Sequence, residues 1–176
     1  MPVFVDNLPA RSASVEQASR DGNLFRAFFQ GSVPDSTTYY FVLDIPEGVS
    51  LIGFSRFIEV EEGSIRSRFG VGTGFGAIQE TYDAHNFKVA GGQASRAQMR
   101  RVTGPVDLEF HSPDRLLAAP TTGPTRIPSN QTDVGAQVTM DSEHLPFFTI
   151  TNLSTTQARE CTLFLAWQEL VKGAYS

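Results

Sequence analysis

Hydrophobic residues that recur at every second position are the feature that most constrains this fold. Between residues 159 and 171, one face of an extended chain would carry four apolar side chains in succession, namely Cys161, Leu163, Leu165 and Trp167. Between residues 64 and 71, the same spacing places Ile65, Ser67, Phe69 and Val71 on one face and Arg66 and Arg68 on the other. A period of two is the geometry of a β-strand, because successive side chains point to opposite faces. The sequence therefore predicts strands, and it predicts that Trp167 belongs to the core.

Further strands are expected where similar runs are bounded by turn residues. They cover residues 24–30, 37–45, 49–60, 106–111 and 147–153. The turn sequences Pro46-Glu47-Gly48 and Glu61-Glu62-Gly63 predict that residues 37–71 form three antiparallel strands joined by short turns. The middle run, 49–60, is apolar on both faces, which fits a strand that is buried on both sides or one that changes sheets.

Helical patterns are few. Residues 12–19 and 94–101 are the two candidates, but the first lacks a wide apolar stripe and the second is only about two turns long. The chain has 176 residues, which is close to the common size of one domain. Together these patterns predict an all-β fold over residues 1–176, a single antiparallel β-sandwich of jelly-roll type with about eight strands.

Two stretches of the sequence lack these patterns. Residues 1–23 hold few apolar side chains, and residues 112–135 are rich in Pro, Thr and Ser. Loops this long in a compact domain are generally functional or disordered. We expect an extended N-terminal arm over residues 1–23 and a long irregular loop over residues 112–135, both of which reach a neighbouring chain. The interface residues predicted on these two segments are Phe4, Leu8, Arg11 and Arg126.

The charge of the chain limits its partners. The net charge is -5 and the isoelectric point is near 5.1, which argues against nucleic acid and against an anionic membrane surface. Arg96, Arg100 and Arg101, with Arg66 and Arg68 upstream, form the densest basic group. This group has two readings: a site that docks on an acidic protein surface, or a charged sheet edge that discourages unwanted strand pairing.

The cysteine count and the N-terminus suggest where the protein is made. Cys161 is the single cysteine, so the chain has no internal disulfide. No basic start followed by an apolar run is present near Met1, and no apolar stretch approaches the length of a membrane helix. We therefore expect synthesis in a cytoplasm, with no membrane partner.

Gly70-Val71-Gly72-Thr73-Gly74-Phe75-Gly76 looks like a phosphate-binding loop. A dinucleotide site needs such a loop between a parallel strand and a helix. Residues 78–85, which follow it, are polar and have no helical stripe. We therefore interpret the glycines as a β-connection, and we predict no cofactor.

Catalytic and metal-binding patterns are weak. Glu80, Asp83 and His85 have the spacing of metal ligands, but a site needs three or four convergent ligands, so we expect a solvated loop and no metal. The sequence contains no G-x-S-x-G motif, and Cys161 lies in an apolar run. We predict that the protein is not an enzyme and has no catalytic residues.

The C-terminal sequence FFTITNLS at residues 147–154, followed by LFLAWQE at residues 163–169, resembles a known group. It is similar to the ending of small β-rich virion proteins of tailed bacteriophages, which close with an I-T-N-x-S hairpin and an L-x-W-x-E strand. The resemblance covers about two thirds of the chain. It implies no catalytic residues, and it implies assembly into a virion in the bacterial cytoplasm.

From the resemblance we expect a capsid decoration protein, or cement protein, that bridges capsid subunits. The expected partners are the major capsid protein or another virion protein, and further copies of this chain. A tail or neck adaptor is the first alternative. The second is a receptor-binding module for carbohydrate, for which exposed aromatic side chains are needed, and the candidates are Tyr82, Phe75 and Phe87.

Overall fold

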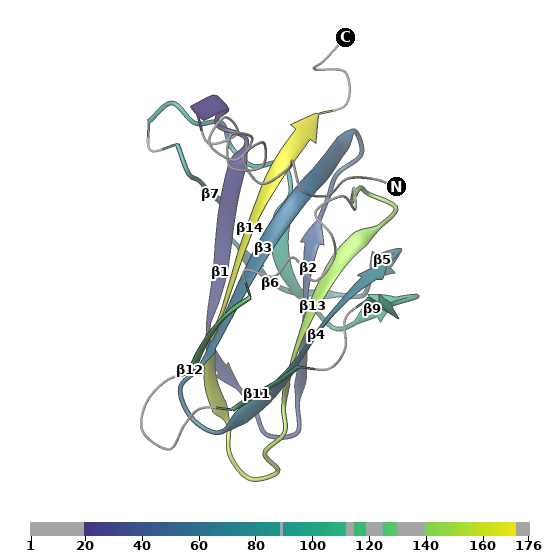
Figure 1. The fold of residues 1–176 in the computed structure, drawn as a ribbon. Helices are drawn as coiled ribbons and strands as arrows, with labels where there is room; N and C mark the ends of the chain where they lie inside the picture. Colours follow the sequence, from purple (N-terminus) through teal and green to yellow (C-terminus); the bar gives the residue numbers. More distant parts are fainter. Residues whose placement is uncertain (1–19, 89, 112–114, 119–124, 130–139, 172–176) are drawn as a thin grey trace, which may run out of the picture.

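The structure is a computed structural model, and it describes residues 20–88, 90–111, 115–118, 125–129 and 140–171. Three antiparallel sheets make up this part of the chain (Figure 1). Sheet A has the strand order β12-β3-β14-β1-β7, and sheet B has the order β10-β4-β13-β2-β8-β6, with β11 also paired to β4. A small third sheet joins β5 and β9. The predicted all-β antiparallel sandwich is confirmed.

The strands have the following bounds. Sheet A consists of β1 (Leu24–Val33), β3 (Val49–Val60), β7 (His85–Asn86), β12 (Thr125–Ser129) and β14 (Arg159–Val171). Sheet B consists of β2 (Thr38–Asp44), β4 (Ser64–Gly72), β6 (Ile78–Tyr82), β8 (Gln98–Val102), β10 (Glu109–Phe110), β11 (Arg115–Ala118) and β13 (Leu145–Asn152). The small sheet consists of β5 (Gly74–Phe75) and β9 (Pro105–Val106).

The first four strands alternate between the two large sheets. β2 and β4 lie on either side of β13 in sheet B, whereas β3 lies beside β14 in sheet A. Residues 37–71 therefore do not form three mutually paired strands. β3 pairs with β14 in sheet A along its whole length, so residues 49–60 do not change sheets within the strand. The turn at residues 61–63 crosses from one sheet to the other with Gly63 at a φ of 72°, a conformation that favours glycine.

The prediction of a helix at residues 94–101 is wrong. Residues 98–102 form β8, which pairs with β2 and β6. Met99 and Val102 are buried by this pairing, and their burial outweighs the weak helical preference of the segment. The other expected helix, at residues 12–19, lies outside the described residues.

Two other sequence expectations need correction. The strand expected at residues 106–111 is split into β9 and β10, because Asp107 has a positive φ of 49° and interrupts the extended chain. The loop expected at residues 112–135 contains β11 and β12, which pair with β4 and β3. The remaining residues of that loop, and residues 1–19 of the expected arm, lie outside the described part of the chain.

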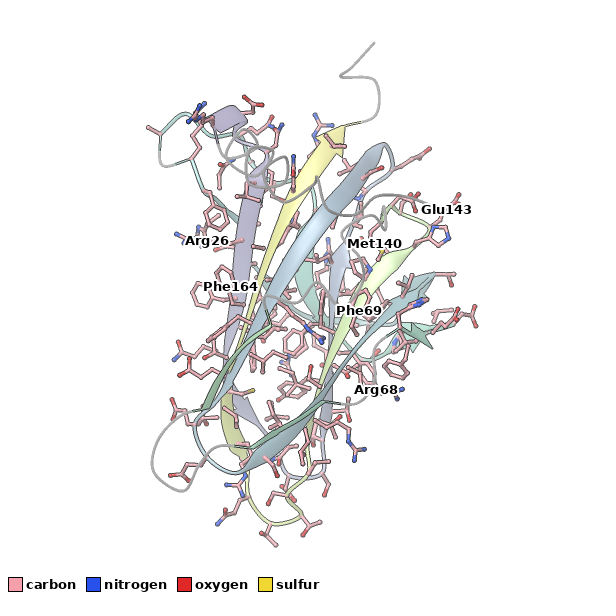
Figure 2. All side chains as sticks on the ribbon, viewed as in Figure 1. Arg26, Arg68, Phe69, Met140, Glu143 and Phe164 are labelled. Carbon is pink, nitrogen blue, oxygen red and sulfur yellow. The ribbon has the colours of Figure 1, made fainter. Side chains whose placement is uncertain are left out.

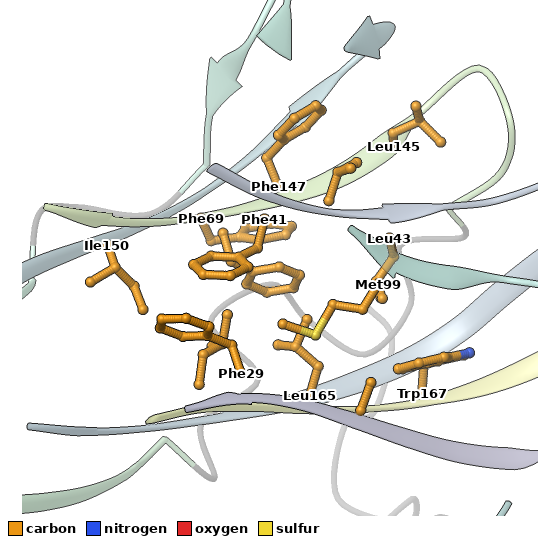
Figure 3. Packing of buried hydrophobic residues seen from close by; sticks show 14 of the residues in the cluster. Phe29, Phe41, Leu43, Phe69, Met99, Leu145, Phe147, Ile150, Leu165 and Trp167 are labelled. Carbon is orange, nitrogen blue, oxygen red and sulfur yellow. The ribbon is translucent and has the colours of Figure 1, made fainter. Parts of the chain in front are cut away.

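The core fills the space between sheets A and B. In β1, Phe25, Ala27 and Phe29 point into it, and the residues between them are exposed, which confirms the period of two. Trp167 is fully buried, as predicted, and stacks on Phe25 with 6.4 Å between ring centroids. Figure 3 shows this packing, with side chains from both sheets meeting in one layer.

Sheet B also has a buried outer face. In Figure 3, Phe147 and Leu145 point away from the side of the sheet that carries Phe41 and Phe69. Phe147 is nevertheless fully buried, and so is Val42, its cross-strand neighbour. The segment that includes Val106, Leu108 and Glu109 lies against Gly70 and Gly72 of β4, so it covers the outer face of sheet B at that strand.

Candidate interaction surface

The arginines that form one group in the sequence are separated by the fold. Arg100 and Arg101 lie on β8, whereas Arg66 and Arg68 lie on β4, and two strands, β13 and β2, separate them in sheet B. Arg68 stacks over the Phe110 ring at 3.5 Å from its centroid. The five arginines are therefore not one continuous basic patch.

Acidic neighbours partly neutralise the β8 arginines. Arg100 forms an ion pair with Asp44 at 3.0 Å across the β2–β8 pair. Arg101 forms one with Glu80 at 3.3 Å and also lies over the Tyr39 ring. Arg96 is exposed in the preceding loop. The docking role of these arginines stays a prediction, and the geometry makes Arg96 its most accessible member.

The interface residues predicted on the arm and the long loop are only partly within the structure. Arg126 lies on β12, as the cross-strand neighbour of Glu59 on β3. Phe4, Leu8 and Arg11 lie outside the described residues. The interface role of all four stays a prediction.

In the acid–histidine cluster, the Glu80 carboxylate is already engaged by other side chains. Tyr82 donates a hydrogen bond to Glu80 Oε2 at 2.7 Å, and the same carboxylate oxygen pairs with Arg101. Burial and the neighbouring carboxylate raise the pKa of the Tyr82 hydroxyl above its ordinary value. His85 lies in β7 as the cross-strand neighbour of Arg26. Within the described ranges, no group of three or more His, Cys, Asp or Glu side chains could hold a metal ion.

The glycine string is a β-connection, as interpreted. Gly70 and Gly72 end β4, and Gly74 begins β5. A Cβ atom on Gly70 would lie 2.6 Å from the carbonyl oxygen of Glu109, and one on Gly72 would lie 3.0 Å from that of Val106. Glycine is required here because the backbone of residues 106–109 passes directly over β4.

The three aromatic side chains expected to bind carbohydrate all pack against their own chain. Tyr82 meets Phe29 edge-on at 6.0 Å between ring centroids. Phe75 is partly buried against the core cluster. Phe87 lies under the guanidinium group of Arg26, 5.1 Å from the ring centroid. All three are partly buried, and their carbohydrate-binding role stays a prediction.

A different set of aromatic residues lies on the outer face of sheet A. Phe28 of β1 is the cross-strand neighbour of Phe164 of β14, which is in turn the neighbour of Phe57 of β3. These three residues, the phenylalanine row, lie side by side across three strands. Phe28 is 50% exposed, and Phe164 and Phe57 are half-buried. Figure 2 shows Phe164 and Arg26 on the side of sheet A that faces away from sheet B.

Sequence reasoning missed the row. A signal was present, because Phe28 and Phe164 each fall on the face opposite to the buried residues of their own strands. Periodicity assigns a residue to a face but does not pair it with a residue on another strand. The register of β1, β14 and β3 was needed to bring the three residues together.

A buried carboxylate holds the loop before β8. Glu169 lies on β14 beside a register shift and is almost fully buried. It accepts hydrogen bonds from Trp167 Nε1 at 3.1 Å, from the backbone N of Ala97 at 3.0 Å, from the backbone N of Arg96 at 3.1 Å and from Ser95 Oγ. The carboxylate thus ties the loop that carries Arg96 to the central strand of sheet A.

The fold and this surface define the class of the protein: a two-layer antiparallel β-sandwich with one outer face partly covered by its own chain and the other bearing an aromatic row. No known family model, curated protein or solved structure matches the chain. The part of the chain that the structure describes contains no helix long and apolar enough to cross a membrane.

Proposed function

We propose that this protein is a non-enzymatic structural protein of a bacteriophage virion, which decorates and cements the capsid by bridging capsid subunits. The observation that carries the proposal is the order in which the strands lie in the two sheets. The eight principal strands, β1–β4 and β11–β14, lie in the order β1-β14-β3-β12 in sheet A and β2-β13-β4-β11 in sheet B.

We infer that this strand order is that of a jelly roll. Numbered along the chain, the principal strands lie in the order 1-8-3-6 in sheet A and 2-7-4-5 in sheet B. The first and last strands are therefore neighbours. In each half of the chain, the principal strands cross from one sheet to the other. Jelly rolls of eight strands build viral capsid domains as well as lectins and cupins. Strands β5–β10 are then an insertion between the fourth and fifth principal strands, and they include the segment that covers sheet B.

A fold does not define a function by itself, so the surface must supply the rest. A cement protein needs a rigid body and more than one contact with its neighbours. The sandwich is the rigid body, and the phenylalanine row, Arg96 and the two segments rich in polar residues are the proposed contacts. An extended chain spans up to about 3.3 Å per residue, so ten residues of the segment 1–19 would reach about 30 Å, far enough for an adjacent subunit.

Removal of residues 2–19 tests the bridging role. All residues of the described hydrophobic core lie between Phe25 and Trp167, and the backbone oxygens of Gly22 and Asn23 accept hydrogen bonds that this deletion leaves in place. We therefore expect the shortened chain to fold but to lose binding to capsids in a co-sedimentation assay. A chain in which residues 2–19 are scrambled is the matched control for length and composition, and it should also fail to bind.

Two outcomes would contradict the proposal. If the shortened chain occupies capsids as fully as the complete one, residues 2–19 do not form the bridge. If particles without the protein keep stable heads but no longer adsorb to cells, the chain is a tail adaptor or a receptor-binding module instead.

A further inference from the structure

The loop between β7 and β8 is held in place although its described residues, 87, 88 and 90–97, form no strand or helix. Figure 1 shows this β7–β8 loop projecting beside the start of β1. Ala97 is its one buried residue among those described, Phe87 and Ser95 are half-buried, and the others are exposed. Because the loop buries so little apolar surface, polar contacts must fix its shape.

Asn86 closes the first part of the loop. Its Nδ2 donates hydrogen bonds to the backbone oxygens of Gly22 at 2.7 Å and of Gln93 at 2.9 Å. Its Oδ1 accepts a hydrogen bond from the backbone N of Lys88 at 2.8 Å. A Cβ atom on Gly92 would lie 2.7 Å from Asn86 Cγ, so the loop packs tightly around this side chain. Asn86 thus fixes the backbone on which Lys88 stands.

The second part of the loop is tied to the two neighbouring strands of sheet A. Glu169 of β14 accepts hydrogen bonds from the backbone N of Arg96 at 3.1 Å and of Ala97 at 3.0 Å. Gln93 Nε2 donates to Asn23 Oδ1, just before β1, at 2.6 Å. A segment that is ordered before it binds loses less conformational entropy on binding. These anchors therefore suit a loop that serves as a contact surface.

The charged side chains of the loop are all positive. Residues 84–97 contain Lys88 and Arg96 and no Asp or Glu. Both side chains are exposed, and no ion pair joins either of them to another described residue. A third cation lies at the base of the loop, where the guanidinium carbon of Arg26 is 5.1 Å from the centre of the Phe87 ring. In a chain of net charge -5, the loop is a local excess of positive charge.

We propose that the β7–β8 loop docks on a carboxylate-rich patch of a partner protein, with Lys88 and Arg96 as the contacting cations. The inference rests on the proposed function only for the identity of the partner, which is then a capsid protein. A nucleic acid fits less well, because an extended polyanion would also meet the acidic remainder of the chain. Exposed charges make the contact, so it is sensitive to salt.

Co-sedimentation with capsids that lack the protein tests the contact. The double variant Lys88→Gln with Arg96→Gln should bind about tenfold more weakly than the wild type, because two exposed charge pairs are lost. Thr155→Glu with Gln157→Glu is the matched control. It makes the same change in net charge in the exposed turn before β14, at the opposite end of β1. The control should bind as the wild type does, and added salt should release both.

Retention of the full-length protein on immobilised poly-L-glutamate tests the chemistry without a capsid. We expect retention at low salt, its loss in Lys88→Gln with Arg96→Gln, and wild-type retention of the control. Both double variants change only exposed side chains, so both should keep the wild-type melting temperature. A resin that carries duplex DNA is the comparison for the class of partner, and it should retain the protein less well than poly-L-glutamate.

The outcomes separate this inference from the proposed function. Wild-type capsid binding by Lys88→Gln with Arg96→Gln would overturn the inference while the proposed function stands. A wild-type protein that poly-L-glutamate does not retain, or that duplex DNA retains more strongly, would also overturn it. A protein that poly-L-glutamate retains through the two cations but that does not bind capsids would contradict the proposed function and leave the role of the loop standing.

Discussion

At the scale of single residues, Glu169 links the core to the loop before β8. Its carboxylate accepts hydrogen bonds from the Trp167 side chain and from the backbone of Arg96 and Ala97. A carboxylate that only accepts is suited to this position, because all its neighbours here are donors. The W-x-E sequence at residues 167–169 therefore has a structural role in this chain.

Glu169→Gln should destabilise the protein. The amide nitrogen of glutamine would face N–H donors, and an unsatisfied buried donor costs about 1–3 kcal/mol. Urea unfolding measures this loss, with Glu62→Gln, which changes an exposed glutamate in a turn, as the matched control near wild-type stability. Hydrogen exchange of the Ala97 amide should become faster in Glu169→Gln. A variant with wild-type stability and a protected Ala97 amide would contradict the structural role.

Cys161 predicts a loss of stability at alkaline pH. Burial raises the pKa of the Cys161 thiol from 9.0 to about 12. The folded protein therefore keeps the proton that the unfolded chain releases, so the thiol's contribution to stability is complete below pH 9 and is lost as the pH rises through about 12. Between pH 8 and pH 10.5, the wild-type free energy of unfolding should fall by about 1–2 kcal/mol more than that of Cys161→Ala. Equal slopes in urea titrations of the two proteins would be evidence against this account.

At the scale of elements, the insertion that covers sheet B depends on glycines in β4. A Cβ atom on Gly70 would lie 2.6 Å from the backbone oxygen of Glu109, so the covering segment would have to shift. We expect Gly70→Ala to cost about 1–3 kcal/mol, the usual range for overpacking. Gly104→Ala is the control, because a Cβ atom on Gly104 would have no other atom within 4 Å. If thermal unfolding shows the same decrease in melting temperature for both variants, the close approach at Gly70 is unimportant.

Much of the strand inventory was predictable from the sequence. The expected runs 49–60 and 159–171 coincide with β3 and β14 residue for residue, because turn residues bound both runs and the second alternates strongly. The partner of each strand was not predictable, since periodicity contains no information about which sheet a strand joins. This is why β3 was expected beside β2 and β4, although it pairs with β14 and β12.

The candidate surface was predictable only in part. Arg96, Arg100 and Arg101 were identified from their density in the sequence, but the ion pairs of Arg100 with Asp44 and of Arg101 with Glu80 join residues far apart in the chain. The phenylalanine row likewise depends on contacts between distant strands. Local sequence patterns assign residues to strands and faces, and the register then assembles the surface.

At the scale of the whole molecule, the two sheets are used differently. The insertion covers sheet B at β4, whereas sheet A presents the phenylalanine row beside Arg26. This division fits a protein that joins a larger assembly through one face.

The central claim, that the protein decorates and cements a capsid, is tested most directly by electron cryomicroscopy of phage particles that contain it, compared with particles that lack it. The account predicts density for the sandwich at regularly repeated positions on the outer surface of the head. It also predicts that heads without the protein break at a lower temperature than complete heads. Density confined to the tail, or heads that are equally stable without the protein, would contradict the claim.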